Sequence, residues 1–383
     1  MQSRLNLTVT AGFAMFAMFF GSGNLVFPLA IGAETTHQAM PAIIGLALTG
    51  VCIPFLGLLS MILFKGDRQG AFSYIGKWPA LFLTFAMLSL MGPFGVAARC
   101  IIVAYGGISQ LFPFISLEVF GVVWAIISGL VILRQGGWIT LIGRYLTPVL
   151  LLSLLVIIIA GLWYAPLTEE SNLTGAEAFS VGLDQGYQTM DLLAAFFFSV
   201  TVVNYLNKAL VGQNTTKILK MSLASSFVGA GLLTLIYIGF VMLGAAYSNE
   251  LLPIAAEQRL TFIAQQTLGS TAMIIVATAI ALACLTTFIV LIVLFAEFLT
   301  NEVSCKKIPY KWSVVITLCI SYTVSLLGFT ALAAWIGQAL QIAYPALIAF
   351  SLALILYRLT KINIIAVAFW GALGIAVLVD FLN

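Results

Sequence analysis

The sequence predicts an all-α polytopic membrane protein with about eleven transmembrane helices, forming one transmembrane domain over residues 1–383. The first observation is composition, since 62% of the residues are hydrophobic, only 8% are charged, and the mean hydropathy is +1.14. A soluble domain is typically about 45–50% apolar and about 25% charged. The other two observations are the recurrence of long apolar runs and the charge in the loops between them. A net charge of +3 without a basic tract excludes a nucleic-acid-binding protein.

Eleven apolar runs, each close to the roughly 20 residues that cross a bilayer, follow one another along the chain. They lie near 11–31, 41–64, 79–112, 117–133, 145–165, 187–206, 221–247, 271–299, 312–328, 331–357 and 364–382. We expect the run containing Pro345 to be one tilted span rather than two short pieces. We expect no cleavable signal peptide, and the longest polar connection, roughly 164–186, leaves no room for a soluble domain.

The basic residues gather in alternate loops. If the N-terminus is cytoplasmic, 14 of the 16 Lys and Arg residues fall in cytoplasmic loops, whereas the outside loops are mostly acidic. Arg259 is the exception in an outside loop, and Arg99 lies within a span. The positive-inside rule therefore predicts a multi-pass protein of the plasma (inner) membrane, with its N-terminus cytoplasmic and, after eleven spans, its C-terminus external.

The first and sixth spans contain residues that interrupt a helix. The first has Gly21-Ser22-Gly23-Asn24 followed by Pro28, a pattern that either opens the helix or forms a small-residue face for helix packing. The sixth has Thr189 and the ionisable Asp191 at the start of a short apolar stretch. A helix interrupted within a membrane requires a cavity or protein around it, because lipid cannot satisfy the freed backbone groups.

These two spans open two blocks of five helices, at about 8–165 and about 178–358, with 363–382 as an extra helix. Because five is odd, the blocks enter the membrane from opposite sides, which predicts a 5+5 inverted repeat. Interrupted helices at matching positions of inverted repeats indicate the binding site of a secondary transporter. Half-helix N–H groups suit a carboxylate, and freed carbonyl groups suit Na⁺.

The eighth span carries Ala283, Thr286 and Thr287, and adjacent threonines usually bond back to their own helix. If they face an opened first span, their hydroxyls and nearby carbonyl oxygens instead form a neutral site for a weakly held monovalent cation.

Three ionisable residues lie within spans, and each can have either a structural or a functional role. Glu297 snorkels to the cytoplasmic end of its helix, which is the interpretation we prefer. Arg99 either supports the structure or acts in function, and Asp191 either caps the inner half-helix or acts in function. A single histidine and five cysteines without CxxC spacing predict no zinc, no haem and no other cofactor.

Several stretches together resemble the branched-chain amino acid:cation symporter family. They are Phe20-Gly21-Ser22-Gly23-Asn24-Leu25-Val26-Phe27-Pro28, Thr49-Gly50-Val51 with Pro54 and Gly57, Gly92-Pro93-Phe94, Gly186-Tyr187-Gln188-Thr189-Met190-Asp191, Leu282-Ala283-Cys284-Leu285-Thr286-Thr287 and Tyr344-Pro345. The resemblance covers nearly the whole chain. It implies a leucine-transporter-like fold with broken helices 1 and 6, and import of leucine, isoleucine and valine with Na⁺ or H⁺.

The resemblance also implies roles for individual residues. The carbonyls of Ala17, Phe20 and Ala283 and the hydroxyls of Thr286 and Thr287 would hold Na⁺. Substrate would be bound by Gly21, Ser22, Gly23, Asn24, Thr189, Asp191 and Phe197, the last as a wall for an aliphatic side chain. Two departures stand out, because family members usually have twelve spans and Ala97-Ala98-Arg99-Cys100 is smaller than the usual pattern.

The sequence thus predicts a monomeric secondary active transporter that works by alternating access, with an amino-acid substrate, Na⁺ or H⁺ and the lipid bilayer as its partners. A symporter for another small amphipathic solute, or one coupled to H⁺ through Asp191, remains an alternative. An intramembrane enzyme and a channel are less favoured, because the sequence has no HExxH, GxSxG, lipid-phosphate or filter motif.

Overall fold

The computed structural model describes residues 4–134, 142–166, 172–210 and 214–382, and within them every regular element is a helix. The expected all-α membrane fold class is therefore confirmed. Part of the connection expected at roughly 164–186 falls on residues 167–171, which lie outside the described residues.

Eight helical stretches of the described chain are long and apolar enough to cross a membrane. They are Ser22–Leu63, Lys77–Ser109, Arg144–Trp163, Asp191–Ala209, Thr216–Ala246, Met273–Val303, Phe329–Thr360 and Ile365–Leu382, with Leu5–Phe19 and Leu117–Leu133 as shorter apolar helices. The count of eleven spans and the orientation of the termini stay predictions.

The helices of the first half of the chain are α1 (Arg4–Phe19), α2 (Ser22–Thr35), α3 (Ala39–Ala47), α4 (Ile53–Leu63), α5 (Arg68–Phe72), α6 (Lys77–Met91), α7 (Val96–Ser109), α8 (Leu117–Leu133) and α10 (Thr147–Trp163). Those of the second half are α11 (Gly175–Tyr187), α12 (Asp191–Ala209), α13 (Thr215–Ala246), α14 (Ser248–Leu251), α15 (Arg259–Leu268), α16 (Ser270–Phe298), α17 (Tyr310–Ser325), α18 (Phe329–Thr360) and α19 (Ile365–Leu382). Single turns of π-helix, η2 (Leu48–Cys52), η4 (Ile142–Leu146) and η6 (Leu299–Val303), adjoin α4, α10 and α16.

The first span is interrupted where its glycines predict. Helix α1 ends at Phe19 and α2 begins at Ser22, after Gly21 takes an extended conformation with φ −115° and ψ −155°. The interruption is shorter than the Gly-Ser-Gly run, because one extended residue is enough to redirect the chain. Ser22 and Gly23 form the first turn of α2, whose N–H groups have no intrahelical acceptors. Pro28 lies inside α2 without ending it.

The sixth span is interrupted between Tyr187 and Asp191, and Met190 adopts the left-handed conformation there with φ 63°. The third span is interrupted as well, since α6 ends at Met91 and α7 begins at Val96. The run that contains Pro345 is one continuous helix as expected, since Pro345 lies inside α18.

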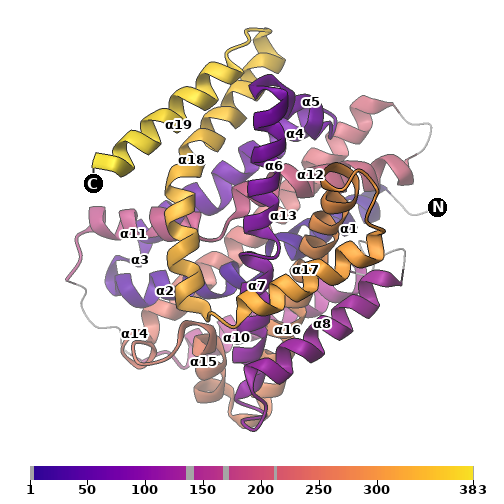
Figure 1. Ribbon diagram of the computed structural model, residues 1–383. Helices are drawn as coiled ribbons and strands as arrows, with labels where there is room; N and C mark the ends of the chain where they lie inside the picture. Colours follow the sequence, from indigo (N-terminus) through magenta and orange to yellow (C-terminus); the bar gives the residue numbers. More distant parts are fainter. Residues whose placement is uncertain (1–3, 135–141, 167–171, 211–213, 383) are drawn as a thin grey trace.

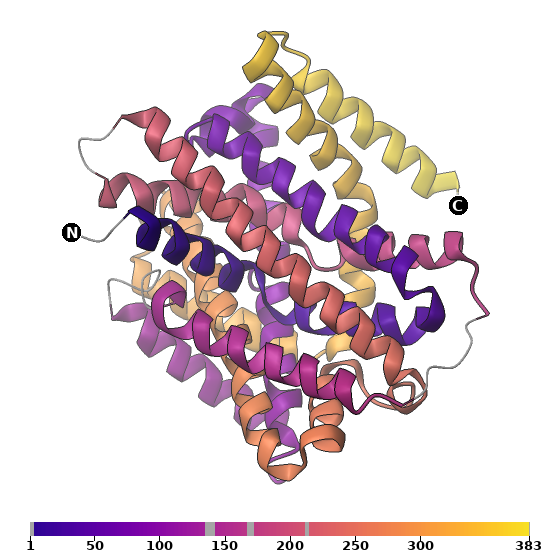
Figure 2. The ribbon, with the colours of Figure 1, turned by 180° about the vertical axis from the view of Figure 1, so that it is seen from behind.

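Glycines bring α2, the second part of the first span, against α13. A Cβ atom on Gly32 of α2 would overlap the backbone of Val241, and one on Gly244 of α13 would overlap the carbonyl of Leu29. Small residues allow helix backbones to approach closely in a membrane bundle. Helix α13 consequently crosses the molecule diagonally against α2 and α1 (Figure 2).

The C-terminal helix lies at the edge of the molecule. Helices α18 and α19 form a hairpin along one side (Figure 1), and only Ile365 and Phe369 of α19 are buried. The interrupted helices, in contrast, are buried along most of their length around their interruptions. The extra helix therefore takes no part in the region where the interruptions meet.

Candidate functional site

The interruptions of the first and sixth spans face each other in the middle of the molecule. A Cβ atom built on Gly23 would lie 3.3 Å from the carbonyl oxygen of Gln188 and 3.3 Å from Cα of Thr189. The positive N-terminal end of α2 thus points to the open turn before α12. Ser22 is fully buried, and its hydroxyl is 3.6 Å from Sγ of Cys100 on α7.

A buried polar network holds Asp191 beside this meeting point. The side-chain amide of Asn24 donates to both carboxylate oxygens, at 3.1 and 2.9 Å, and the hydroxyl of Tyr237 on α13 donates to one of them at 2.7 Å. Asn24 also contacts the Tyr237 hydroxyl, and its side-chain oxygen accepts from the N–H of Gly21 at 3.3 Å. Asn24 therefore both fixes the turn before α2 and ties it to α12.

The interpretation of Asp191 as a helix cap is wrong. Met190 occupies the N-cap position of α12, and the Asp191 carboxylate points away to partners on α2 and α13. A capping carboxylate accepts from N–H groups in the first turn of its own helix, and Asp191 makes no such bond among the described contacts. Asp191 is 1% exposed, so it depends on these long-range donors to compensate its burial.

A small cavity lies between the two interruptions and α16. Asn24, Thr189, Asp191 and Thr287 contribute its polar lining, and the Thr189 hydroxyl donates to the carbonyl of Gly186 at 2.8 Å. Its apolar lining is Met18, Phe19, Met91, Val96, Met190, Ala194, Phe198 and Leu291. Apolar walls with a few convergent polar groups are typical of small-molecule sites.

Phe197 does not reach this cavity, and Phe198 lines it instead. The Phe197 ring lies 5.0 Å from the guanidinium carbon of Arg68, in a second cavity between α12 and α16. Arg68 forms an ion pair with Glu302 at 2.8 Å, the one ion pair among the described residues. Burial lowers the pKa of Arg68, and the neighbouring Glu302 carboxylate opposes this change.

The two threonines of α16 meet the end of α1. The Thr287 hydroxyl lies 3.2 Å from the carbonyl oxygens of both Ala17 and Met18, and the Thr286 hydroxyl lies 3.2 Å from that of Ala17. Only Thr286 also bonds back to its own helix, to the carbonyl of Ala283 at 3.0 Å.

Oxygen atoms alone form this cluster, and all of its residues are buried. Two hydroxyls and the carbonyls of Ala17, Met18 and Ala283 provide hard, uncharged ligands of the kind that alkali cations prefer. The chemistry of the donors therefore fits a Na⁺ ion. Phe20, the remaining expected ligand, lies in the interruption itself, fully buried with its ring stacked on Phe16.

Arg99 of α7 reaches the same interruption of the sixth span. Its Nη2 atom donates to the Gln188 carbonyl at 3.2 Å and lies 3.0 Å from Sδ of Met190. The side chain is fully buried, and its guanidinium carbon lies 5.5 Å from the centre of the Phe27 ring.

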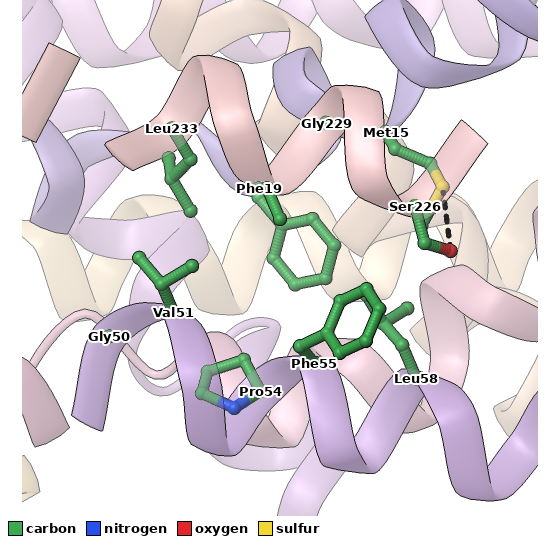
Figure 3. Close-up of a pocket in the computed structure, with 11 residues that line it drawn as sticks. Met15, Phe19, Gly50, Val51, Pro54, Phe55, Leu58, Ser226, Gly229 and Leu233 are labelled. Carbon is green, nitrogen blue, oxygen red and sulfur yellow. Dashed lines mark hydrogen bonds between the residues drawn. The ribbon is translucent and has the colours of Figure 1, made fainter. Parts of the chain in front are cut away.

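A different small cavity lies on the other side of Phe19, between α1, η2, α4 and α13 (Figure 3). The hydroxyl of Ser226, which points to Sδ of Met15 at 3.7 Å, is the only side-chain polar group in its lining. This cavity offers a single hydroxyl and no charged side chain to an ammonium or a carboxylate. The cavity between the interruptions is consequently the better candidate for a polar ligand.

Sequence reasoning missed three members of the site. Tyr237 lies in the middle of a long apolar run, and a tyrosine there signals a buried hydroxyl that needs a partner. The carbonyl of Met18 joins the oxygen cluster because α1 ends at the next residue. Phe198 replaces Phe197 because the rotation of α12 decides which ring faces the cavity.

Comparisons with known proteins give matches over most of the chain. The family model described as "Branched-chain amino acid transport protein" matches residues 5–383. A "Putative branched-chain amino acid carrier protein" of Staphylococcus epidermidis is 31% identical over 369 residues, 91% of this chain and 81% of its own. One of Staphylococcus aureus, strain USA300, is 32% identical over 362 residues, covering 89% and 80%.

Solved structures share the fold at low identity. Mhp1, a nucleobase-cation-symport-1 family transporter in a closed conformation, aligns over 96% of this chain and 91% of its own, with a TM-score of 0.64 and 14% identity. A Na⁺-coupled sialic acid symporter aligns over 96% and 88%, with a TM-score of 0.59 and 15% identity.

Proposed function

Because the chain belongs to the branched-chain amino acid transport protein family, we propose that it imports leucine, isoleucine and valine by symport with Na⁺. It works by alternating access across the plasma (inner) membrane, as a monomer with its N-terminus cytoplasmic and its C-terminus external. One observation carries the proposal: the interrupted first span contributes both to a neutral oxygen cluster and to a cavity with polar groups.

The substrate occupies the cavity between the two interruptions. Its carboxylate binds at the turn of Gly21, Ser22 and Gly23, where the half-helix end is positive and the N–H groups of Ser22 and Gly23 lack intrahelical acceptors. Asn24 keeps this turn open, and Thr189 and Asp191 line the facing side. The aliphatic side chain lies against apolar walls that include Phe198, the ring that replaces Phe197 in this role.

Na⁺ binds between α1 and α16. The carbonyls of Ala17, Phe20 and Ala283 and the hydroxyls of Thr286 and Thr287 are its ligands, and Met18 joins them. The threonine hydroxyls then turn their lone pairs to the ion instead of donating to carbonyls. Neutral ligands hold a monovalent ion weakly enough for it to leave in every cycle.

Uptake of labelled leucine into proteoliposomes tests the proposal. An inward Na⁺ gradient is expected to drive accumulation of leucine, and unlabelled isoleucine or valine is expected to compete. Accumulation that depends on an inward proton gradient instead would assign the coupling to H⁺, for which the buried Asp191 carboxylate is the candidate carrier. Absence of leucine uptake under both gradients, with another small amphipathic solute accumulated, would refute the substrate assignment.

A further inference from the structure

Arg99 is the largest fully buried side chain of the described residues, and its charge is poorly compensated. Among the described residues no carboxylate lies within 4.0 Å of it, because the one ion pair is Arg68–Glu302. Its Nη2 atom has one backbone acceptor and one thioether, and a thioether is a weak acceptor. Its Nε and Nη1 atoms, though buried, have no hydrogen-bond partner in the described part of the chain.

A buried guanidinium of this kind is costly unless an acceptor of opposite charge reaches it. The ring of Phe27, 5.5 Å away, compensates only part of that cost. The carboxylate of Asp191 follows this interruption in the chain, but Asn24 and Tyr237 already donate to its oxygens. Among the described residues, Arg99 is therefore left with unpaired donors. Met190, which Arg99 contacts, lines the cavity between the two interruptions.

The guanidinium and the N-terminus of α2 converge on one point. The carbonyl oxygen of Gln188 lies 3.2 Å from Nη2 of Arg99 and 3.3 Å from the position of a Cβ atom on Gly23. A contact of 3.6 Å between Cys100 and Ser22 holds the next residue of α7 against the same turn. A ligand atom that reaches the N–H groups of this turn is thus close to a cationic side chain.

We propose that Arg99 supplies the charged half of the carboxylate subsite, so that the guanidinium and the first turn of α2 bind the substrate carboxylate together. The inference rests on the proposed function. It commits the site to ligands with a carboxylate, because an anion pairs with the fork of a guanidinium far better than an alcohol or an amide does. In the arrangement described here, Sδ of Met190 occupies one of the guanidinium donors, and this unbranched side chain can move aside for a stronger acceptor.

Three ligands that share one isobutyl group test this assignment: L-leucine, L-leucinol, which lacks the carboxylate, and 4-methylpentanoate, which lacks the amine. Binding is measured as thermal stabilisation of the purified full-length protein at saturating Na⁺. Wild type is expected to bind leucine about 10- to 100-fold more tightly than leucinol, the usual range for a charge-assisted hydrogen bond. Arg99→Met is expected to bring the two affinities within about threefold of each other, and Arg99→Lys to restore part of the difference.

Arg259→Met is the matched control, because Arg259 lies on α15, where its Nε donates to the carbonyl of Ile254 at 3.2 Å, outside the cavity lining. It is expected to leave all three affinities unchanged. An Arg99→Met protein that loses leucine and leucinol binding equally would make Arg99 a structural support of the sixth span and overturn the inference.

The wild-type series keeps the inference falsifiable if Arg99→Met does not fold. Two results with the wild-type protein alone would overturn the inference. One is binding of leucinol as tight as that of leucine, and the other is binding of 4-methylpentanoate no tighter than that of its uncharged analogue 4-methylpentanamide. Wild type that binds no branched-chain amino acid at all refutes the proposed function instead, so the two failures are distinguishable.

Discussion

Replacing Gly23 by alanine is expected to weaken leucine binding by at least about tenfold, which corresponds to about 1.4 kcal/mol. The added methyl group would lie 3.3 Å from the Gln188 carbonyl oxygen and from Cα of Thr189, and 3.5 Å from the Phe27 ring. Carbon atoms pack best at about 3.5–4.0 Å, so the methyl group fills the gap between the two interruptions. A carboxylate at the N–H groups of the α2 turn needs that same space.

The fold is expected to survive this change. Overpacking of a few tenths of an ångström costs about 1–3 kcal/mol, whereas alanine gains about 1 kcal/mol over glycine within a helix. The net effect on the free energy of unfolding is therefore about 2 kcal/mol or less. Gly231→Ala is the matched control, because a Cβ atom there meets nothing within 4 Å on α13.

The assay compares leucine affinity and membrane yield for Gly23→Ala, Gly231→Ala and wild type. Gly231→Ala is expected to bind leucine as wild type does and to be slightly more stable. A Gly23→Ala protein that inserts normally and binds leucine with wild-type affinity would refute the assignment of the carboxylate to this turn. The interpretation of Gly21-Ser22-Gly23 as a simple packing face would then be preferred.

Three further predictions concern the cation, the buried carboxylate and the topology. Replacing Thr286 or Thr287 by alanine is expected to raise the Na⁺ concentration for half-maximal leucine uptake about tenfold, whereas replacement by serine is expected to be tolerated. Unchanged Na⁺ dependence in the double alanine variant would place the cation elsewhere. Asp191→Asn places an amide NH₂ group opposite the donors of Asn24 and Tyr237, and it is expected to reduce leucine uptake at least about tenfold. Uptake at the wild-type rate in this variant would show that the polar network around Asp191 is not required for transport. Cysteines introduced at the exposed Leu5 and Leu382 of a cysteine-free variant should label from opposite faces, and labelling from one face contradicts eleven spans.

The positions of the main interruptions were predictable because the chemistry is local. Glycine and serine weaken a helix wherever they lie, so the Gly21-Ser22-Gly23 run located the end of α1 to within a few residues. Asp191, costly in a membrane, marked the start of α12 in the same way. The interruption between Met91 and Val96 was not predicted, although glycine and proline lie there, because an apolar run of sufficient length hides it.

Which side chains contact one another in the site was less predictable, because these contacts depend on helix rotation and join distant parts of the chain. Tyr237 donates to a carboxylate 46 residues before it, and no local pattern links the two. Phe197 and Phe198 are adjacent, yet one residue turns a helix by about 100°, so packing alone decided which ring faces the cavity. Likewise, the back-bonding expected of adjacent threonines holds for Thr286 but is absent among the described contacts of Thr287.

The two halves of the proposed site meet in one short segment, which would give the proposed coupling of ion and substrate a physical basis. The carbonyls of Ala17 and Met18 precede the interruption of the first span, and Gly23 and Asn24 follow it. An ion that draws the carbonyls and the Thr287 hydroxyl together fixes the end of α1, and a carboxylate at the next turn fixes the start of α2. In the proposed mechanism each ligand therefore contributes part of the ordering that the other requires, and the resulting increase in affinity would be reciprocal.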